Sequence, residues 1–196
     1  ITCRDWSSDV CSSDLGLQVQ GGFIVGFDHD SPKTFQRLLD FIQQSGIVTA
    51  MVGILQAPPG TKLFDRMSKS GRINNKMSGD NVDGSTNLIP KMEMEILKNE
   101  YNELVQTLYS PAGYYQRVKT FLQDYTLPKI KMNINLSFII ENLMAFLGSI
   151  IRLGIFSKER LYYWKLFFWT LFHKPSSFAQ AITFSIYGYH FRKICD

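Results

Sequence analysis

Hydrophobic positions in the first half of the chain follow two alternating periods, that of a buried strand and that of a helix. Residues 17–25 read LQVQGGFIV, which alternates at first and then runs continuously apolar, as in a strand buried on both faces. Apolar side chains recur at helical spacing over residues 32–46, and a second apolar run covers residues 47–55. Residues 62–70 have the pattern of a short helix that stops at Gly71. This order of elements, with short connections, predicts βαβ units and a parallel sheet.

The second half of the chain begins with a polar stretch and then shows only helical patterns. Residues 72–90 are rich in Asn, Asp, Gly and Ser, which predicts a long loop of the kind that is often functional. The patterns after this loop predict helices over residues 92–109, 110–127, 136–156, 158–173 and 176–195. The expected fold class is therefore α/β followed by all-α, with Tyr114 and Tyr115 in the core of the helical part.

Charge and cysteine content separate these two halves and limit their chemistry. Residues 1–125 carry 12 basic and 14 acidic side chains, whereas residues 126–196 carry 9 basic and 3 acidic ones. A hydrophobic content of 45% with 19% charged residues argues against a disordered chain. The three cysteines, Cys3, Cys11 and Cys195, are too few for a disulfide scaffold, and their spacing matches no zinc or iron–sulfur ligand set. No metal site is predicted within this chain.

The first fifteen residues differ in kind from the rest. Residues 5–15 read DWSSDVCSSDL, which has no apolar period and resembles the translation of a common sequencing-adapter oligonucleotide. We therefore expect residues 1–15 to be a non-native, adapter-like scar, the alternative being a polar disordered N-terminus. On this interpretation the protein's own sequence starts at or before Gly16, and an upstream part is missing.

The ends of the two predicted strands hold the candidate binding residues. Gly22 and Gly26 flank the apolar end of the first strand in GGFIVGFDHD, and glycine in a strand commonly marks a close approach of a backbone or a ligand. No G-x-G-x-x-G opens the following helix, so the stretch is not a dinucleotide fingerprint. Gln56 stands at the end of the second strand, before the turn APPGT. It could hydrogen-bond a ligand or stabilise this turn.

Taken together, these stretches resemble a known superfamily. Residues 21–47 (GGFIVGFDHDSPKTFQRLLDFIQQSGI) and 51–67 (MVGILQAPPGTKLFDRM) resemble the fifth and sixth strand–helix units of the radical S-adenosylmethionine barrel. GDNVDGSTNLIPKM, KERLYYWKLFFWTLFHKP and IYGYHFRK resemble the C-terminal extension of a subgroup that carries an N-terminal cobalamin-binding domain. The resemblance implies the last βα units of a partial (β/α) barrel over residues 16–72, a loop or lid over 73–91, and a helical C-terminal domain over 92–196.

The same resemblance implies cofactors and an activity. In that superfamily a G-x-I-x-G strand lies against the adenine of S-adenosylmethionine, and Gly22, Ile24 and Gly26 stand at its positions, with Gln56 as a further candidate. The superfamily's C-x3-C-x2-C triad is not found in this chain, so a [4Fe–4S] cluster and cobalamin are expected only through the missing upstream part. We expect a cobalamin-type radical enzyme that cleaves S-adenosylmethionine reductively and acts on a small-molecule or lipid-like substrate. Its catalytic residues are unknown, and this chain alone is expected to be inactive.

Two polar clusters have simpler explanations than a metal site. Asp28, His29 and Asp30 could serve metal or acid–base chemistry, but no second group of ligands accompanies them, and we expect Asp30 to cap the following helix. The acids and amides of residues 80–87 do not fit a calcium loop, because no Glu stands at the twelfth position. We expect this loop to form a lid over the barrel mouth or a seam beside it.

The basic, aromatic C-terminal part supports a non-enzymatic alternative. Residues 160–174 combine Trp, Tyr and Phe with basic side chains, which suits a helix on an anionic lipid surface. The alternative function is a membrane-surface or partner-docking module; packing of these aromatic side chains in a core is the simpler explanation. No stretch has the roughly 20 apolar residues of a spanning helix. The expected location is cytoplasmic, with peripheral membrane contact as an option.

Two further classes are not expected. Nucleic-acid binding lacks a recognisable motif and a sufficient basic excess. An unrelated, cofactor-free α/β fold would continue with further strand–helix pairs, and residues 92–196 contain none.

Overall fold

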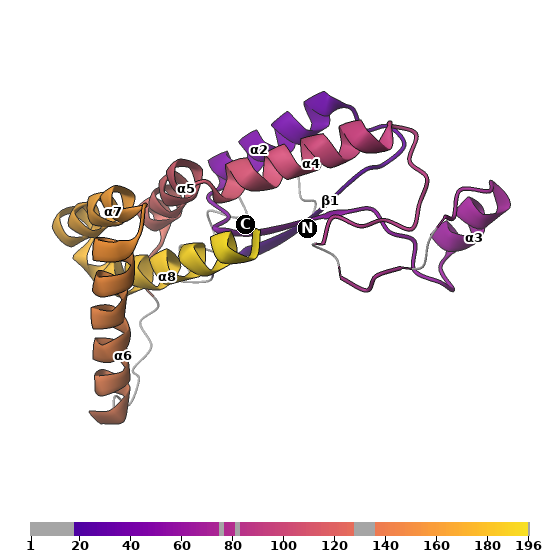
Figure 1. Cartoon of the computed structure of the whole chain (residues 1–196). Coiled ribbons are helices and arrows are strands. Elements are labelled where there is room, and N and C mark those ends of the chain that lie inside the picture. Colours follow the sequence, from indigo (N-terminus) through magenta and orange to yellow (C-terminus); the bar gives the residue numbers. More distant parts are fainter. Residues whose placement is uncertain (1–17, 75–76, 81–82, 128–135, 196) are drawn as a thin grey trace. The chain divides into compact units, whose positions relative to one another are not determined.

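A computed structural model describes residues 18–74, 77–80, 83–127 and 136–195 (Figure 1). Contacts between residues divide the chain into two compact units, each of which is described by itself. The sheet unit consists of Gln20–Ile42 and Thr49–Leu108. The helical unit contains Gln43–Val48 and the chain from Tyr109 onward. The adapter-like scar predicted for residues 1–15 lies outside the described residues.

A parallel strand–helix–strand motif forms the centre of the sheet unit. β1 (Gln20–Val25) and β2 (Thr49–Ile54) pair in parallel, with Gln20 opposite Thr49 and Val25 opposite Ile54. The connection between them is α2 (Pro32–Ser45), which is followed by Gly46 with φ +70°. The glycine stop, the helix and the parallel pairing agree with the α/β pattern of the sequence. Only two strands lie among the described residues, so a barrel is not shown.

Two helices cover one face of this sheet. α2 and α4 (Met94–Tyr109) run side by side above the strands in Figure 1. The ring of Phe23 meets that of Phe41 edge to face at 6.1 Å, which joins β1 to α2. The Tyr101 hydroxyl donates to the Val52 carbonyl at 3.1 Å, which joins α4 to β2. The covered face is therefore a buried apolar layer.

The opposite face of the sheet is open, which corrects the expectation that β1 is buried on both faces. Ile24 and Met51 lie on this face and are 56% and 49% exposed. Gly22 is exposed beside them and pairs with Met51 across the strands. Burial on both faces requires two covering layers, and α2 and α4 supply one.

The segment after β2 has a small core of its own. α3 (Lys62–Lys69) begins at Thr61, whose Oγ1 accepts the Phe64 N–H at 3.2 Å. The predicted loop follows, and it is tied across its base by an antiparallel bridge between Ile73 and Leu88. Leu88 is buried together with Ala57 and Met67. The loop is thus attached to the sheet unit at both of its ends.

Helices make up the second unit, largely as the sequence predicts. Their bounds are α5 (Pro111–Asp124), α6 (Leu136–Ser149), α7 (Arg160–His173), the 3-10 turn η2 (Pro175–Ser177) and α8 (Phe178–Cys195). The predicted helix over residues 136–156 is corrected, because its last part, η1 (Ile150–Phe156), is π-helical. In η1 the Gly154 carbonyl accepts the Trp164 indole N–H at 3.0 Å, so a side chain takes part in the backbone hydrogen bonding. Among the described helices, none is both long and apolar enough to cross a bilayer.

Buried aromatic and cationic groups form the core of the helical unit. Tyr114 is fully buried, and its hydroxyl donates to the Phe184 carbonyl at 2.8 Å. The Arg117 guanidinium is also fully buried, lies 5.5 Å from the centre of the Tyr114 ring, and donates to the Val48 carbonyl. Burial lowers the pKa of Arg117 and raises that of Tyr115 to about 12. Tyr114 and Tyr115 are core residues, as the sequence predicts.

The compact units do not coincide with the predicted domains. The sequence suggests a boundary between residues 91 and 92, before the first helix of the C-terminal domain. In the structure α4 packs on the sheet through Leu97 and Tyr101, so the division between units falls at Tyr109. An amphipathic pattern shows that a helix has a buried face, but the pattern does not show which element covers that face.

We expect Gly188→Ala to destabilise the helical unit, because an added Cβ would lie 2.3 Å from the buried Tyr114 ring. Overpacking of this kind costs about 1–3 kcal/mol. Gly148→Ala, in open space on α6, is the matched control and should stabilise by about 0.5–1 kcal/mol. Thermal unfolding of both variants measures the difference. Equal melting temperatures would contradict the packing of α8 on α5.

Candidate functional site

The open face of the sheet is the first part of the candidate site. Gly22, Ile24 and Met51 share this face, because side chains alternate along each strand and Gly22 pairs with Met51. An added Cβ at Gly22 would meet no atom within 4 Å, so nothing in the described structure requires glycine there. The result is an apolar surface, flat at Gly22, that has room for a ligand.

The turn after β1 is held by an aspartate. Gly26 has φ +93°, which favours glycine, and an added Cβ would lie 3.3 Å from Ile54. The Asp30 carboxylate accepts the N–H groups of Gly26 at 2.8 Å and Phe27 at 2.9 Å. This corrects the expectation that Asp30 caps the following helix: its carboxylate reaches back to the end of the strand. The turn is thereby kept in one conformation.

An ion pair connects this turn to the start of the loop. Arg72 donates two hydrogen bonds to the Asp28 carboxylate, at 2.7 and 2.9 Å, and its Nε donates to the Ile89 carbonyl at 2.8 Å. The Lys91 ammonium lies 3.9 Å from the same carboxylate. The hydrogen bonds from Arg72 hold the pKa of Asp28 below its usual value, and those same bonds raise the pKa of Arg72. Asp28 is therefore a structural anion at neutral pH.

Gln56 connects the end of β2 to the same loop. Its amide nitrogen donates to the Asp80 carbonyl at 2.9 Å and to the Ser85 carbonyl at 3.3 Å. These bonds hold the loop rather than the turn after β2, and a contact of Gln56 with a ligand stays a prediction. Its Oε1 is buried and accepts no hydrogen bond from the described residues.

Asn87 is the residue that the sequence analysis missed. It is 1% exposed, and its side chain accepts the Ala57 N–H and donates to the Ala57 carbonyl, both at 2.8 Å. Thr86 adds a hydrogen bond from its hydroxyl to the Leu55 carbonyl at 2.6 Å. The loop is therefore bonded along residues 55–57 and forms a seam there, while its expected place over or beside a barrel mouth stays a prediction. Asn87 looks like any polar loop residue in the sequence, and nothing there distinguishes it.

The two aspartates at this edge of the sheet are engaged in hydrogen bonds within the chain. His29 is exposed, and Asp28 and Asp30 are occupied by hydrogen bonds within the chain. Within the described ranges, no three His, Cys, Asp or Glu side chains come together as metal ligands. Cys3 and Cys11 lie outside those ranges, so the expectation that they form no metal site stays a prediction.

Comparison with known proteins indicates a class of enzymes. The chain is 33% identical over 178 residues to an uncharacterized methyltransferase of Synechocystis sp., an alignment that covers 90% of this chain and 33% of that protein. It is 31% identical over 106 residues to the hopanoid C-2 methylase of Rhodopseudomonas palustris (54% and 19%). It is 45% identical over 51 residues to the bacteriochlorophyllide d C-12(1)-methyltransferase of Chlorobaculum tepidum (26% and 11%). All three relatives are named for methyl transfer, and the chain spans about a third of the first and less of the other two.

The larger part of the chain matches a known protein family. Residues 61–196 match the family described as Domain of unknown function (DUF4070), and the chain belongs to this family. The match begins at Thr61, so it includes the loop and every helix from α3 to α8, whereas Gly22, Ile24, Gly26 and Gln56 precede it. No solved structure is significantly similar to the chain.

Asn87→Ala should release the loop from residues 55–57, because both hydrogen bonds to the buried Ala57 backbone are lost. Leaving two buried polar groups unpaired costs about 2–4 kcal/mol. Urea denaturation and hydrogen exchange at residues 83–89 measure the effect. Asn102→Ala, at an exposed position of α4, is the control and should change neither. Unchanged exchange in Asn87→Ala would disprove the seam.

Arg72→Gln should raise the pKa of Asp28 toward its usual value, because the hydrogen bonds that lower it are lost. A lowered folded-state pKa stabilises above the unfolded value of about 4, and this contribution disappears as the pH falls through the folded pKa. NMR titration of the carboxyl carbons measures the shift. Asp83 is the internal control, because Ser85 lowers its pKa through local hydrogen bonds. An unchanged Asp28 titration would exclude the ion pair in solution.

Proposed function

We propose that this chain is part of a radical S-adenosylmethionine methyltransferase of the cobalamin-dependent type. Three observations support the proposal: the strand motifs of the sequence, the methyl-transfer names of the relatives, and the open apolar face of the β1–β2 sheet. The third carries the proposal to particular residues. In this proposal the sheet supplies one wall of the cofactor site.

The open face suits the adenine ring of S-adenosylmethionine. Adenine is flat and largely apolar on its faces, and it requires a surface from which no Cβ projects. Gly22 supplies that surface, because nothing lies within 4 Å of the Cβ position. Ile24 and Met51, each about half exposed, offer apolar contacts on either side. These side chains would lose water on binding, which favours association.

The remaining site residues would hold this wall in place and contact the edge of the ligand. Asp30 and Gly26 keep the turn after β1 closed, so the ligand does not have to order it. Gln56 is the further candidate; its Oε1 is buried and has no hydrogen-bond partner among the described residues, so a contact with the ligand would require its side chain to move. S-adenosylmethionine, when bound, supplies an activated methyl group and, after reductive cleavage, a radical. The cluster and cobalamin would bind outside the described part of the chain.

A carbon atom of a lipid-like substrate is the proposed methyl acceptor. Two relatives are named for methylation at the C-2 position of a hopanoid and at the C-12(1) position of a bacteriochlorophyllide. Those substrates belong to those proteins, and their names support the reaction class for this chain rather than the identity of its substrate.

Binding of S-adenosylhomocysteine, an unreactive analogue, tests the proposal on this chain. Methyl NMR signals of Ile24 and Met51 should shift saturably, whereas those of the fully buried Ile42 should not. Gly22→Leu fills the open face and should weaken binding about tenfold, which is ~1.4 kcal/mol. Gly148→Leu, a matched change in open space on α6, should have no effect.

Two results would refute the proposed wall. One is the absence of any saturable shift at Ile24 and Met51 over the millimolar range. The other is binding that Gly22→Leu leaves unchanged, which would place the ligand elsewhere on the chain.

A further inference from the structure

The helical unit carries a row of exposed apolar side chains along α6 and η1. These are Ile140, Leu143, Met144, Leu147, Ile151 and Ile155, with exposures between 48% and 67%. In α6 their spacing of three and four residues places them on one face of the helix. Phe146 and Ser149 lie on the opposite face, where Phe146 meets the rings of Phe167 and Phe178. The outer face of α6 is therefore apolar although these side chains remain about half exposed or more among the described residues of the unit.

A second row continues on the outer face of α7. Leu161, Phe168 and Phe172 are 76%, 49% and 75% exposed, and they recur at helical spacing. Tyr163, Leu166 and Thr170 occupy the inner face and are buried. Phe156, the last residue of η1, is 80% exposed. Together we call the two rows and Phe156 the outer apolar surface.

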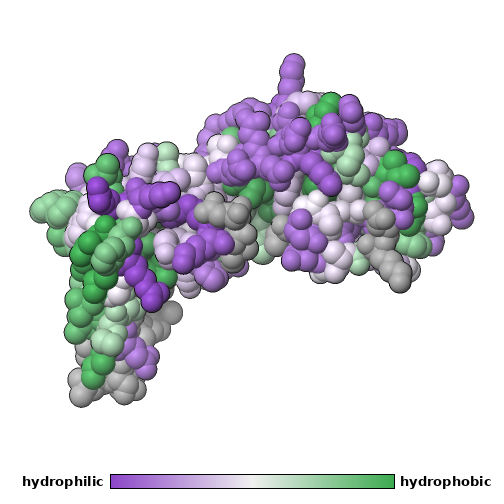
Figure 2. All heavy atoms as spheres, viewed as in Figure 1, coloured by the Kyte–Doolittle hydropathy of each residue, from purple (hydrophilic) through white to green (hydrophobic). Residues whose placement is uncertain are grey.

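This surface is larger than the scattered apolar residues of an ordinary protein exterior. Figure 2 shows hydrophobic residues along the length of α6. Exposed apolar patches mark sites of interaction with a protein or a membrane. The partner of the outer apolar surface is therefore either a protein or a membrane.

The charges beside the outer apolar surface favour an anionic partner. Exposed basic residues on η1, on α7 and between them are Arg152, Lys158, Arg160 and Lys165. Glu159 is paired with Arg192 and is not available to balance them. On α6 Glu141 is exposed and is the single acid among the described side chains of that helix. A second copy of the same surface would bring like charges together, whereas an anionic partner complements them.

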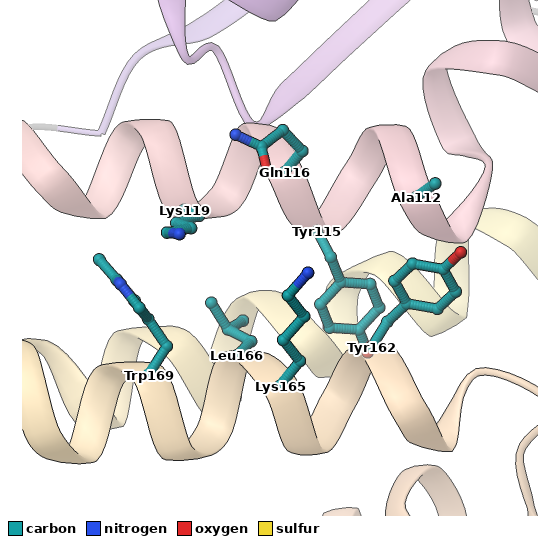
Figure 3. A pocket seen from close by; sticks show the side chains of 8 residues that line it. All are labelled: Ala112, Tyr115, Gln116, Lys119, Tyr162, Lys165, Leu166 and Trp169. Atoms are coloured by element: carbon teal, nitrogen blue, oxygen red, sulfur yellow. The ribbon is translucent and has the colours of Figure 1, made fainter.

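A groove at the border of this surface has the chemistry of an anion site. It lies between α5 and α7, has a volume of about 230 Å³, and is walled by Tyr115, Tyr162 and Trp169 (Figure 3). Lys165 extends from α7 toward α5, and the Lys119 ammonium lies 5.1 Å from the centre of a Trp169 ring. Among the described residues, no acid lines the groove. Lys165 also stands within the outer row, between Leu161 and Phe168, so the groove and the row adjoin.

We propose that the outer apolar surface docks the protein on an anionic lipid bilayer. The side chains of the two rows enter the boundary between headgroups and acyl chains, as in an interfacial helix. The basic side chains beside them meet lipid phosphates, and Lys119 and Lys165 hold one headgroup phosphate in the groove. A bilayer satisfies both features at once, because its surface is anionic and the layer beneath it is apolar. This role is independent of the proposed methyl transfer.

Vesicle flotation of the 196-residue chain tests the proposal. It should bind vesicles that contain phosphatidylglycerol and bind pure phosphatidylcholine vesicles at least tenfold more weakly. Binding should also weaken as salt rises, because salt screens exposed charges. The double variant Leu161→Ser/Phe172→Ser should lose at least tenfold in affinity while its circular dichroism spectrum is unchanged, since both side chains are exposed. Ile96→Ser/Tyr187→Ser, which also removes two exposed apolar side chains, is the matched control and should bind normally.

The groove is tested separately from the apolar rows. Lys119→Ala/Lys165→Ala should prefer anionic vesicles less strongly than the unchanged chain does, because the groove no longer holds a phosphate while Arg152, Lys158, Arg160 and the apolar contacts remain. The proposal would be overturned if the chain did not bind anionic vesicles. It would also be overturned if none of these variants changed the binding. Sedimentation velocity without lipid provides a further test. A dimer that Leu161→Ser/Phe172→Ser abolishes would assign the surface to a second copy and overturn docking on lipid.

Discussion

Burial of the β1–β2 sheet on one face only is the constraint on which the candidate site depends. Phe23 and Val52 point toward α2 and α4, and this apolar layer fixes the register of the two parallel strands. Because side chains alternate, the same register brings Gly22, Ile24 and Met51 together on the other face. That face exists as a surface only because the covering helices lie on one side. A one-residue slip of either strand would remove the pairing of Gly22 with Met51 and would end the site.

Beside this face, the loop after α3 is positioned by side chains that form hydrogen bonds with backbone N–H and carbonyl groups. Asn87 pairs with both polar groups of Ala57, as a neighbouring strand would, and Gln56 reaches two carbonyls of the loop. Buried polar groups must find partners, so these hydrogen bonds specify where the loop lies more sharply than apolar contacts alone do. The Asp28–Arg72 pair then adds a charged link at the edge. The turns after β1 and β2 and the loop after α3 are in this way joined to one another by hydrogen bonds.

The helical unit distributes its apolar residues differently, with an aromatic and cationic core and an apolar exterior. Tyr114 and Arg117 are buried at its centre, where a hydroxyl and a guanidinium find carbonyl acceptors. The outer sides of α6 and α7 are apolar as well, so these helices have little amphipathic contrast. A helix that is apolar all round is either enclosed or faces a nonaqueous partner. This property distinguishes α6 and α7 from α4, whose exposed side is mostly polar or charged.

Local patterns in the sequence determined most of the elements. Ser110–Pro111 begins a helix, Gly46 and Gly71 end two others, and the apolar runs mark both strands, because caps, stops and periodicity act within a few residues. The motif also named Gly22, Ile24 and Gly26 as candidate cofactor contacts, and this stays a prediction. The tertiary structure decided which face of β1 is open and that α4 packs on the sheet. It also decided that Asp30 accepts hydrogen bonds from the end of β1 and that Asn87 binds the loop to Ala57. Each of these depends on a partner distant in sequence or on the direction of a side chain, and neither is encoded in local spacing.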